Sequence, residues 1–453
     1  MASRGEFSSR TAFVLAAAGS AIGLGNIWGF PIQVASNGGG AFVFTYIILT
    51  FLLAYPVLMA ELVIGRYAKT DTVSSVLAIS SKRMRPLAYI TAYWGMLTAV
   101  LILSFYSIIA GWMIAHFFGS IAELIGLIKV KQWLIEFSLA RNLIFCAGFY
   151  LLTVSIIAKG VASGIERWST RLMPALLLLL IVLIGYIATL PGAAEGWRIY
   201  LQPDFSKVLN PDLVIDALGQ AFFSLSLGVG TMMIYGSYVS KSENLAKLGA
   251  SVAALDIGVA ILAGLLVIPA MYVALHNGVT IYDEAGNLLA SDNLIFTVLP
   301  SLFETMGSAG VVVSGLFFAL MTIAALTSSI SILEVPVAFA TEKHNMPRPK
   351  AALVVGLIVF AISVTIIFNF ATLFGNVVAF STKYSEPLVG LLFCIFVGWI
   401  WNRNQILGEI KKGSPDAENS LFWKIWPNYV RFVCPVLVLA LFAHSLGLLG
   451  FIS

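Results

Sequence analysis

The fold is decided by a stretch inside the first long apolar segment, residues 19–31, which reads Gly19-Ser20-Ala21-Ile22-Gly23-Leu24-Gly25-Asn26-Ile27-Trp28-Gly29-Phe30-Pro31. Four glycines and a proline within thirteen residues weaken a helix, because glycine adds backbone entropy to the unfolded chain and proline lacks the N–H donor. The stretch therefore predicts a helix that opens near the middle of this segment.

An opened turn in the middle of a membrane-length helix has chemical consequences. Lipid cannot bond the freed N–H and C=O groups, so such a turn survives only where it is buried in protein or lines a cavity. Freed carbonyls bind a small cation, and the N–H groups that begin the next half-helix attract a carboxylate. The alternative interpretation is that the small residues serve close helix packing.

The composition predicts an all-α polytopic membrane protein. The chain has 453 residues, of which 59% are hydrophobic and 11% are charged, and its mean hydropathy is +0.95. These values exclude a soluble globular domain. The net charge of +4 is scattered between apolar segments, which does not indicate nucleic-acid binding. We expect no cleaved signal peptide, with the first span serving as the signal. Cys146, Cys394 and Cys434 lie in apolar surroundings and predict neither a disulfide framework nor a metal site.

A membrane-spanning helix needs about 20 mainly apolar residues, and this criterion predicts eleven spans. The spans are residues 10–36, 40–68, 86–124, 140–158, 164–188, 212–240, 243–276, 309–342, 349–368, 371–402 and 422–450. With a cytoplasmic N-terminus, 20 of the 26 Lys and Arg residues fall on the inner side and 5 on the outer side. The C-terminus is then expected outside. The outer stretch 292–303 predicts either a short lid helix or a passive loop.

A weak internal repeat predicts one transmembrane domain over residues 1–453, built from two inverted repeats at about 10–188 and 212–402 with an additional helix at about 422–450. Span 1 is interrupted at residues 19–26 and span 6 at residues 224–230. The two breaks are five spans apart, so the copies have opposite membrane orientation, which is typical of secondary transporters.

The polar residues inside the spans favour ion binding over enzyme chemistry. Asn26, Ser224 and the run Thr327-Ser328-Ser329 offer hard oxygen ligands, although hydroxyls in membrane helices often bond to the preceding turn instead. Ionisable residues inside spans are functional candidates, and here they are Glu61, Asp256, Glu334, Lys383 and Glu386. We expect Glu61 to accept N–H groups freed at the breaks, Asp256 to lie next to a cation, and Lys383 either to pair with Glu386 or to act at a site. No phosphate-binding loop or histidine cluster is present, so energy should come from an ion gradient.

Several motifs together resemble the neurotransmitter:sodium symporter family, in particular its bacterial amino-acid transporters. They are Gly23-Leu24-Gly25-Asn26, Phe30-Pro31, Asn37-Gly38-Gly39-Gly40-Ala41-Phe42, Glu61, Gly65-Arg66-Tyr67, residues 220–230, Tyr235-Gly236-Ser237-Tyr238 and Leu326-Thr327-Ser328-Ser329. The resemblance covers nearly the whole chain. It implies symport by alternating access around a site near the middle of the membrane.

The resemblance also implies two sodium sites. The first would be made by the Ala21 carbonyl with Asn26, Ser224 and Asp256, and completed by the substrate carboxylate. The second would be made by the carbonyls of Gly19, Ile22 and Ala324 with the hydroxyls of Thr327 and Ser328.

The same resemblance implies the substrate contacts and the gates. The contacts would be Ala21, Leu24, Gly25, Ile102, Tyr106, Phe223, Ser224, Ser226, Val229, Ser328 and Ile332. The carboxylate would meet the backbone N–H groups of Leu24 and Gly25 and the Tyr106 hydroxyl. Phe223 would close the pocket from outside, and Arg4 and Glu342 match a cytoplasmic ion pair. Gly164 and Pro174 would let span 5 unwind to admit water.

Three features depart from the family pattern. Position 29 is glycine where the outer gate has arginine, and the acidic partner near Ala371 is missing. Asp256 replaces asparagine, so its carboxylate can take the place of chloride near Tyr46, Gln220 and Ser224. Eleven spans appear where relatives usually have twelve.

These observations lead to one expectation and three alternatives. We expect sodium-coupled, chloride-independent symport of hydrophobic L-amino acids, aliphatic and aromatic, across the bacterial cytoplasmic membrane. The alternatives are transport of another solute or coupling to protons on a similar fold, a receptor that binds amino acids without translocating them, and an ion channel. Hydroxyls at Thr327 and Ser328 favour sodium over protons.

Overall fold

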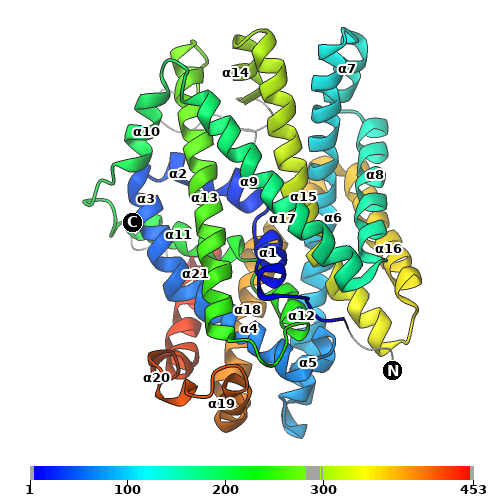
Figure 1. The fold of residues 1–453 in the computed structure, drawn as a ribbon, viewed down its shortest axis with the longest axis vertical. Coiled ribbons are helices and arrows are strands. Elements are labelled where there is room, and N and C mark those ends of the chain that lie inside the picture. The colour runs from blue at the N-terminus through cyan, green and yellow to red at the C-terminus, as the bar shows by residue number, and fades with distance from the viewer. Residues whose placement is uncertain (1–4, 282–295, 297–298, 449–453) are drawn as a thin grey trace.

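The structure is a computed structural model that describes residues 5–281, 296 and 299–448. Within these residues every regular element is a helix (Figure 1). Nine helical segments in the described part are long and apolar enough to cross a membrane, and a bent pair of helices makes a tenth. Predicted span 6 is not among them, because each of its two halves is too short to cross a membrane alone. The predicted all-α membrane fold is confirmed, and the eleven predicted spans are compatible with it.

The spans are formed by the following elements. Spans 1–5 are α1 (Arg10–Ala21), η1 (Gly25–Gly29) and α2 (Phe30–Ser36); α3 (Gly40–Leu49), η2 (Thr50–Ala54) and α4 (Tyr55–Ala68); α6 (Arg85–Leu124); α8 (Leu139–Ile157); and η4 (Val161–Glu166) with α9 (Arg167–Ile187). Spans 6–9 are α11 (Pro211–Ser224) and α12 (Thr231–Ser237); α13 (Leu245–His276); α15 (Ser308–Lys343); and α16 (Arg348–Phe368). Spans 10 and 11 are α17 (Phe370–Ala379), η7 (Phe380–Ser385), α18 (Glu386–Ile395) and η8 (Phe396–Ile400); and α20 (Leu421–Asn428), η10 (Tyr429–Val433) and α21 (Cys434–Ser445).

Short helices connect the spans at the two ends of the molecule. They are α5 (Thr72–Ala78), η3 (Lys82–Met84), α7 (Ile128–Ile135), α10 (Ala193–Leu201), α14 (Leu299–Thr305), α19 (Arg403–Lys411) and η9 (Ala417–Asn419). Figure 1 shows α7, α10 and α14 toward one end and α5, α19 and α20 toward the other. Of the predicted lid at residues 292–303, the part from Leu299 onward is helical, while residues 292–295 and 297–298 lie outside the described residues.

The break in span 1 lies where the glycines predicted it. Helix α1 ends at Ala21, Ile22 has extended backbone angles (φ −72°, ψ 96°), and the helix resumes with η1 at Gly25. The two halves are bent by 58°. Pro31 is the second residue of α2 and follows the π-helical turn η1, which runs into α2 with helical backbone angles.

The break in span 6 depends on left-handed backbone conformations. Ser226, Gly228 and Gly230 have φ values of 51°, 79° and 83°, and α12 begins at the next residue, Thr231. Gly228 is further required by packing, since a Cβ there would lie 2.2 Å from the Glu386 carbonyl oxygen. The Gly228 N–H donates to Glu61 Oε1 at 2.7 Å, which confirms that Glu61 accepts an N–H freed at a break.

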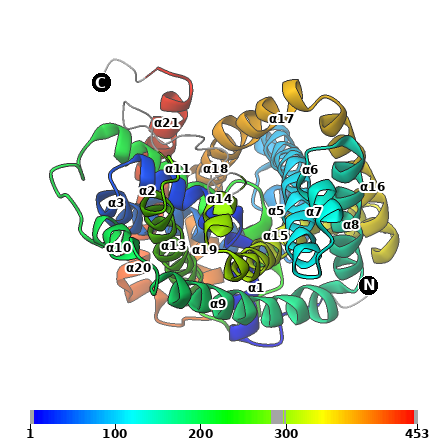
Figure 2. The same cartoon turned by 90° about the horizontal axis from the view of Figure 1, so that it is seen from above.

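The two broken spans are held in the interior by helices that approach closely. Helices α6 and α15 pack along each other (Figure 2), and α12 packs against α4. A Cβ at Gly65 would lie 1.9 Å from the Met233 carbonyl oxygen, and one at Gly236 would lie 2.7 Å from that of Leu62. Small residues therefore allow the second half of span 6 to lie directly on span 2.

Candidate functional site

The break in span 1 faces a buried cluster of oxygen atoms from three other spans. Asn26 Nδ2 donates to Ser224 Oγ (3.0 Å) and to Asp256 Oδ1 (2.8 Å), and Ser224 Oγ donates to Asp256 Oδ2 (2.8 Å). The Tyr46 hydroxyl lies 3.1 Å from Ser224 Oγ and 3.3 Å from Asp256 Oδ2. All four side chains are fully buried. Spans 1, 2, 6 and 7 thus converge on one carboxylate, and three of the residues expected for the first sodium site, Asn26, Ser224 and Asp256, lie together.

A second cluster lies on the other side of the same break, where α15 meets α1. Ser328 Oγ lies 3.4 Å from the Gly19 carbonyl oxygen and 3.3 Å from that of Ile22. Thr327 Oγ1 bonds back to the carbonyl of Ala324 at 3.0 Å, as hydroxyls in membrane helices often do. Of the residues expected for the second sodium site, Ser328 thus contacts the carbonyls of Gly19 and Ile22, while Thr327 and Ala324 bond to each other within α15.

Gly23 lies between the two clusters and contacts the residues expected to bind a carboxylate. The Leu24 N–H donates to the Tyr106 hydroxyl at 3.1 Å. A Cβ at Gly23 would lie 2.5 Å from Ser328 Oγ and 2.6 Å from the Tyr106 hydroxyl oxygen. Only glycine lets α6 and α15 bring these hydroxyls against the opened backbone, a role that the sequence motif alone did not reveal.

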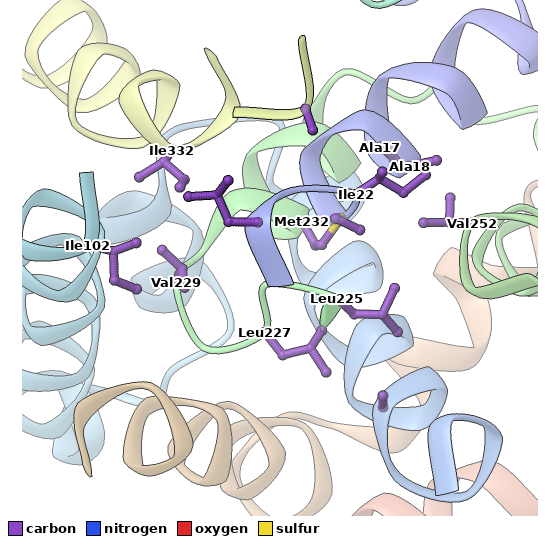
Figure 3. Packing of buried hydrophobic residues seen from close by; sticks show 14 of the residues in the cluster. Ala17, Ala18, Ile22, Ile102, Leu225, Leu227, Val229, Met232, Val252 and Ile332 are labelled. Carbon is purple, nitrogen blue, oxygen red and sulfur yellow. The ribbon is translucent and has the colours of Figure 1, made fainter. Parts of the chain in front are cut away.

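Aliphatic side chains lie beside this polar centre. Figure 3 shows Ile102 of α6, Val229 of the span 6 break and Ile332 of α15 around the same region as the span 1 break. They are 5%, 1% and 4% exposed. Phe223 covers the break from α11, since a Cβ at Gly25 would lie 3.0 Å from its ring. Ser226 Oγ reaches the Ser20 carbonyl at 3.4 Å. The centre is thus polar along the opened backbone and apolar beside it.

Comparisons with known proteins agree with this architecture. The model of the "Sodium:neurotransmitter symporter family" matches residues 4–136 and 132–449. The chain belongs to this family.

Individual relatives match over nearly their whole length. The sodium-dependent transporter YhdH of Bacillus subtilis (strain 168) is 33% identical over 98% of both chains. A sodium-dependent transporter of Methanocaldococcus jannaschii is 28% identical over 99% of this chain and 92% of its own length. The crystal structure of MhsT in complex with L-phenylalanine matches with a TM-score of 0.81 and 35% identity, over 98% of this chain and all of MhsT. The protein is a sodium-dependent symporter with transmembrane helices.

Position 29, where the family pattern has the arginine of the outer gate, is a glycine that lies beside the uncharged side chain of Gln220. Gln220 Nε2 donates to the Gly25 carbonyl at 2.9 Å, and a Cβ at Gly29 would lie 3.5 Å from Gln220 Oε1. Gln220 therefore ties α11 to the start of the second half of span 1.

On the opposite side, the described residues give a partial view of the expected gate. Arg4 lies outside the described residues. Glu342 accepts hydrogen bonds from Thr70 Oγ1 and the Asp71 N–H, both at 2.8 Å. Gly164 lies in η4, the π-helical start of span 5, and a Cβ there would lie 2.2 Å from the Ile156 carbonyl oxygen. Pro174 lies inside α9.

Two ion pairs of the symporter, each with a fully buried carboxylate, were not predicted as pairs. The Arg348 guanidinium donates to both carboxylate oxygens of Glu334 (3.0 and 2.5 Å), and the Tyr238 hydroxyl donates to the same carboxylate at 2.6 Å. Arg66 Nε donates to Glu409 Oε1 at 2.9 Å, with both side chains fully buried. No sequence signal links Arg66 to Glu409, because 343 residues separate them.

The suggested pairing of Lys383 with Glu386 is wrong. It is absent from the ion pairs of the described residues. Lys383 lies in the π-helical turn η7, whose wider winding removes the alignment that a spacing of three residues has in an α-helix.

Proposed function

We propose that the protein couples sodium to the uptake of hydrophobic L-amino acids. One observation carries the proposal: a buried oxygen cluster around Asp256 and the backbone around Leu24 lie on the same opened turn. An amino acid has a carboxylate that suits the half-helix start and the Tyr106 hydroxyl, and an apolar side chain that suits Ile102, Val229 and Ile332. The similarity to a protein solved with L-phenylalanine supports this substrate class.

Two sodium ions fit the residues that meet here. The first would be held by the Ala21 carbonyl, Asn26, Ser224 and Asp256, provided that the Asn26 amide presents its oxygen where its nitrogen now faces Asp256. Sodium there would touch the substrate carboxylate, so each ligand raises the affinity of the other. The second ion would use the carbonyls of Gly19, Ile22 and Ala324 with Thr327 and Ser328.

Chloride independence is part of the proposal. Asp256 is fully buried, and Tyr46, Ser224 and Asn26 surround its carboxylate. A fixed negative charge at this position would compensate the sodium charge without a mobile anion.

Alternating access would use the two inverted repeats, residues 10–188 and 212–402, with residues 422–450 as an additional helix. Phe223 would close the site from outside. On the inner side Arg4 and Glu342 would form the gate, and unwinding at Gly164 and Pro174 would release the second ion. The distribution of Lys and Arg supports a cytoplasmic N-terminus and an outer C-terminus in a bacterial cytoplasmic membrane.

Equilibrium binding to the purified protein tests the substrate class and the coupling. Labelled L-phenylalanine and L-leucine are titrated in sodium, in potassium, and in sodium with gluconate replacing chloride. The proposal predicts saturable binding that requires sodium and is unchanged by gluconate. Equal binding in sodium and potassium, or binding of a charged amino acid in preference to both, would contradict it.

A further inference from the structure

Spans 10 and 11 meet in two π-helical turns, η8 and η10, near the end of span 10. A Cβ at Gly398 would lie 2.7 Å from Arg431 Cα, so the two backbones touch. Trp399 Nε1 donates to the Arg431 carbonyl at 3.0 Å. The Arg431 guanidinium carbon lies 4.2 Å from the centre of the Trp399 ring and 5.3 Å from that of Phe432. This contact between η8 and η10, called the seam below, thus holds the Arg431 cation on the face of the Trp399 indole ring.

This seam faces the surroundings of the bundle. Trp399, Phe432, Val433 and Val436 are 55%, 53%, 38% and 64% exposed, and Arg431 is exposed beside them. Helix α21 lies at the rim of the molecule when it is seen from above (Figure 2). Trp399 is one residue from the end of η8, and tryptophan favours the level at which the hydrocarbon meets the lipid headgroups. Arg431 therefore lies on an exposed face of the bundle beside the end of span 10, and its side chain is long enough to reach toward the headgroup layer.

The positive charge at this end of spans 10 and 11 is incompletely neutralised by the described residues. Glu409 is bound by Arg66 and Lys412, and Glu418 by Lys411. No carboxylate of the described chain forms an ion pair with Arg431, Lys424 or Arg403. The Arg403 guanidinium lies over the Trp423 ring, 5.4 Å from its centre. Trp423 directly precedes Lys424 in the sequence. Leu421 and Ile425, which flank Lys424 on α20, are 73% and 51% exposed.

A charged side chain at a lipid-facing position normally pairs or reaches the headgroup layer, because hydrocarbon does not solvate it. A guanidinium donates two parallel hydrogen bonds to a phosphate and stacks on an aromatic ring at the same time. We propose that Arg431, held on Trp399 and assisted by Lys424, binds the phosphate of an anionic phospholipid whose acyl chains lie along Phe432, Val433 and Val436. On the orientation proposed above, the lipid belongs to the cytoplasmic leaflet.

Native mass spectrometry of the full-length, delipidated protein tests the site. Phosphatidylglycerol and phosphatidylcholine with identical acyl chains are added separately, and inorganic phosphate is added alone as a third arm. The wild type should retain phosphatidylglycerol over phosphatidylcholine, and Arg431→Gln should weaken phosphatidylglycerol about fivefold, the effect of one cation near an anionic headgroup. Lys424→Gln should reduce retention in the same direction.

Arg171→Gln is the matched control, because Arg171 is exposed on α9 and forms neither a cation–π contact nor an ion pair within the described residues. It should leave the lipid preference unchanged. Equal retention by the wild type and Arg431→Gln, an equal loss in Arg171→Gln, or binding of phosphate alone at the same strength would overturn the proposal. If Arg431→Gln does not purify, Trp399→Leu with Lys424→Gln carries the same test.

Discussion

Replacing Gly23 by alanine perturbs the substrate centre and both candidate sodium clusters through one methyl group. The added Cβ would lie 2.5 Å from Ser328 Oγ and 2.6 Å from the Tyr106 hydroxyl oxygen, whereas real Cβ contacts stay above 3.0 Å. Each hydroxyl must therefore withdraw by about 0.4–0.5 Å or the opened turn must move. Ser328 Oγ already lies 3.4 and 3.3 Å from the carbonyls of Gly19 and Ile22, so withdrawal breaks both contacts.

The expected cost follows from these contacts. The Ser328 hydroxyl has one proton, so its two carbonyl contacts make one shared hydrogen bond of about 1 kcal/mol. Losing it together with the bond from the Leu24 N–H to the Tyr106 hydroxyl, with some added strain from overpacking, amounts to roughly 2–3 kcal/mol. Sodium-dependent amino-acid binding should weaken by about 30- to 150-fold, since about 1.4 kcal/mol corresponds to a factor of ten. Scintillation-proximity binding of labelled L-phenylalanine across a sodium titration measures the change. Gly185→Ala is the control, because nothing lies within 4 Å of a Cβ at Gly185. Binding of Gly23→Ala within twofold of wild type would refute the reasoning.

Three further predictions address the ion clusters and the fold. Asp256→Asn removes the buried charge that Asn26 and Ser224 contact, so binding should become chloride-dependent; unchanged binding in gluconate would speak against the role given to Asp256. Ser328→Ala should raise the sodium concentration for half-maximal binding by about five- to tenfold, because it removes a hydroxyl contact of about 1 kcal/mol; a shift in maximal binding alone would contradict this. Arg66→Ala leaves Glu409 buried without its main partner and should destabilise the protein by about 3–5 kcal/mol. The melting temperature should therefore fall. The control Arg198→Ala breaks an exposed ion pair and should leave the melting temperature nearly unchanged.

The positions of the helix breaks could be predicted from the sequence because their causes are local. Glycines at 19, 23 and 25 weaken the helix of span 1 wherever the chain is placed, and lipid forces the opened turn into the protein interior. The role of Glu61 followed from the same reasoning, since a buried carboxylate needs donors and the breaks release them. Hydropathy located the spans for an equally local reason.

The remaining contacts depend on tertiary structure. Arg66 and Glu409 meet only because α4 and α19 pack together, and no pattern in either segment indicates the other. Lys383 and Glu386 have a spacing that suits an α-helix, but a π-helical turn changes the winding between them. Gly23 belonged to the motif, yet its contacts with Tyr106 and Ser328 emerge only when α6 and α15 meet span 1.

The central claim is that sodium drives the entry of a hydrophobic amino acid, and accumulation in sealed proteoliposomes tests it most directly. Uptake of labelled L-phenylalanine is followed under three conditions. These are an inward sodium gradient with chloride, potassium in place of sodium on both sides, and an inward sodium gradient with gluconate in place of chloride. Our account predicts uptake above the external concentration that requires the sodium gradient and persists without chloride. Sodium-dependent binding without accumulation would instead describe a receptor and would contradict the account.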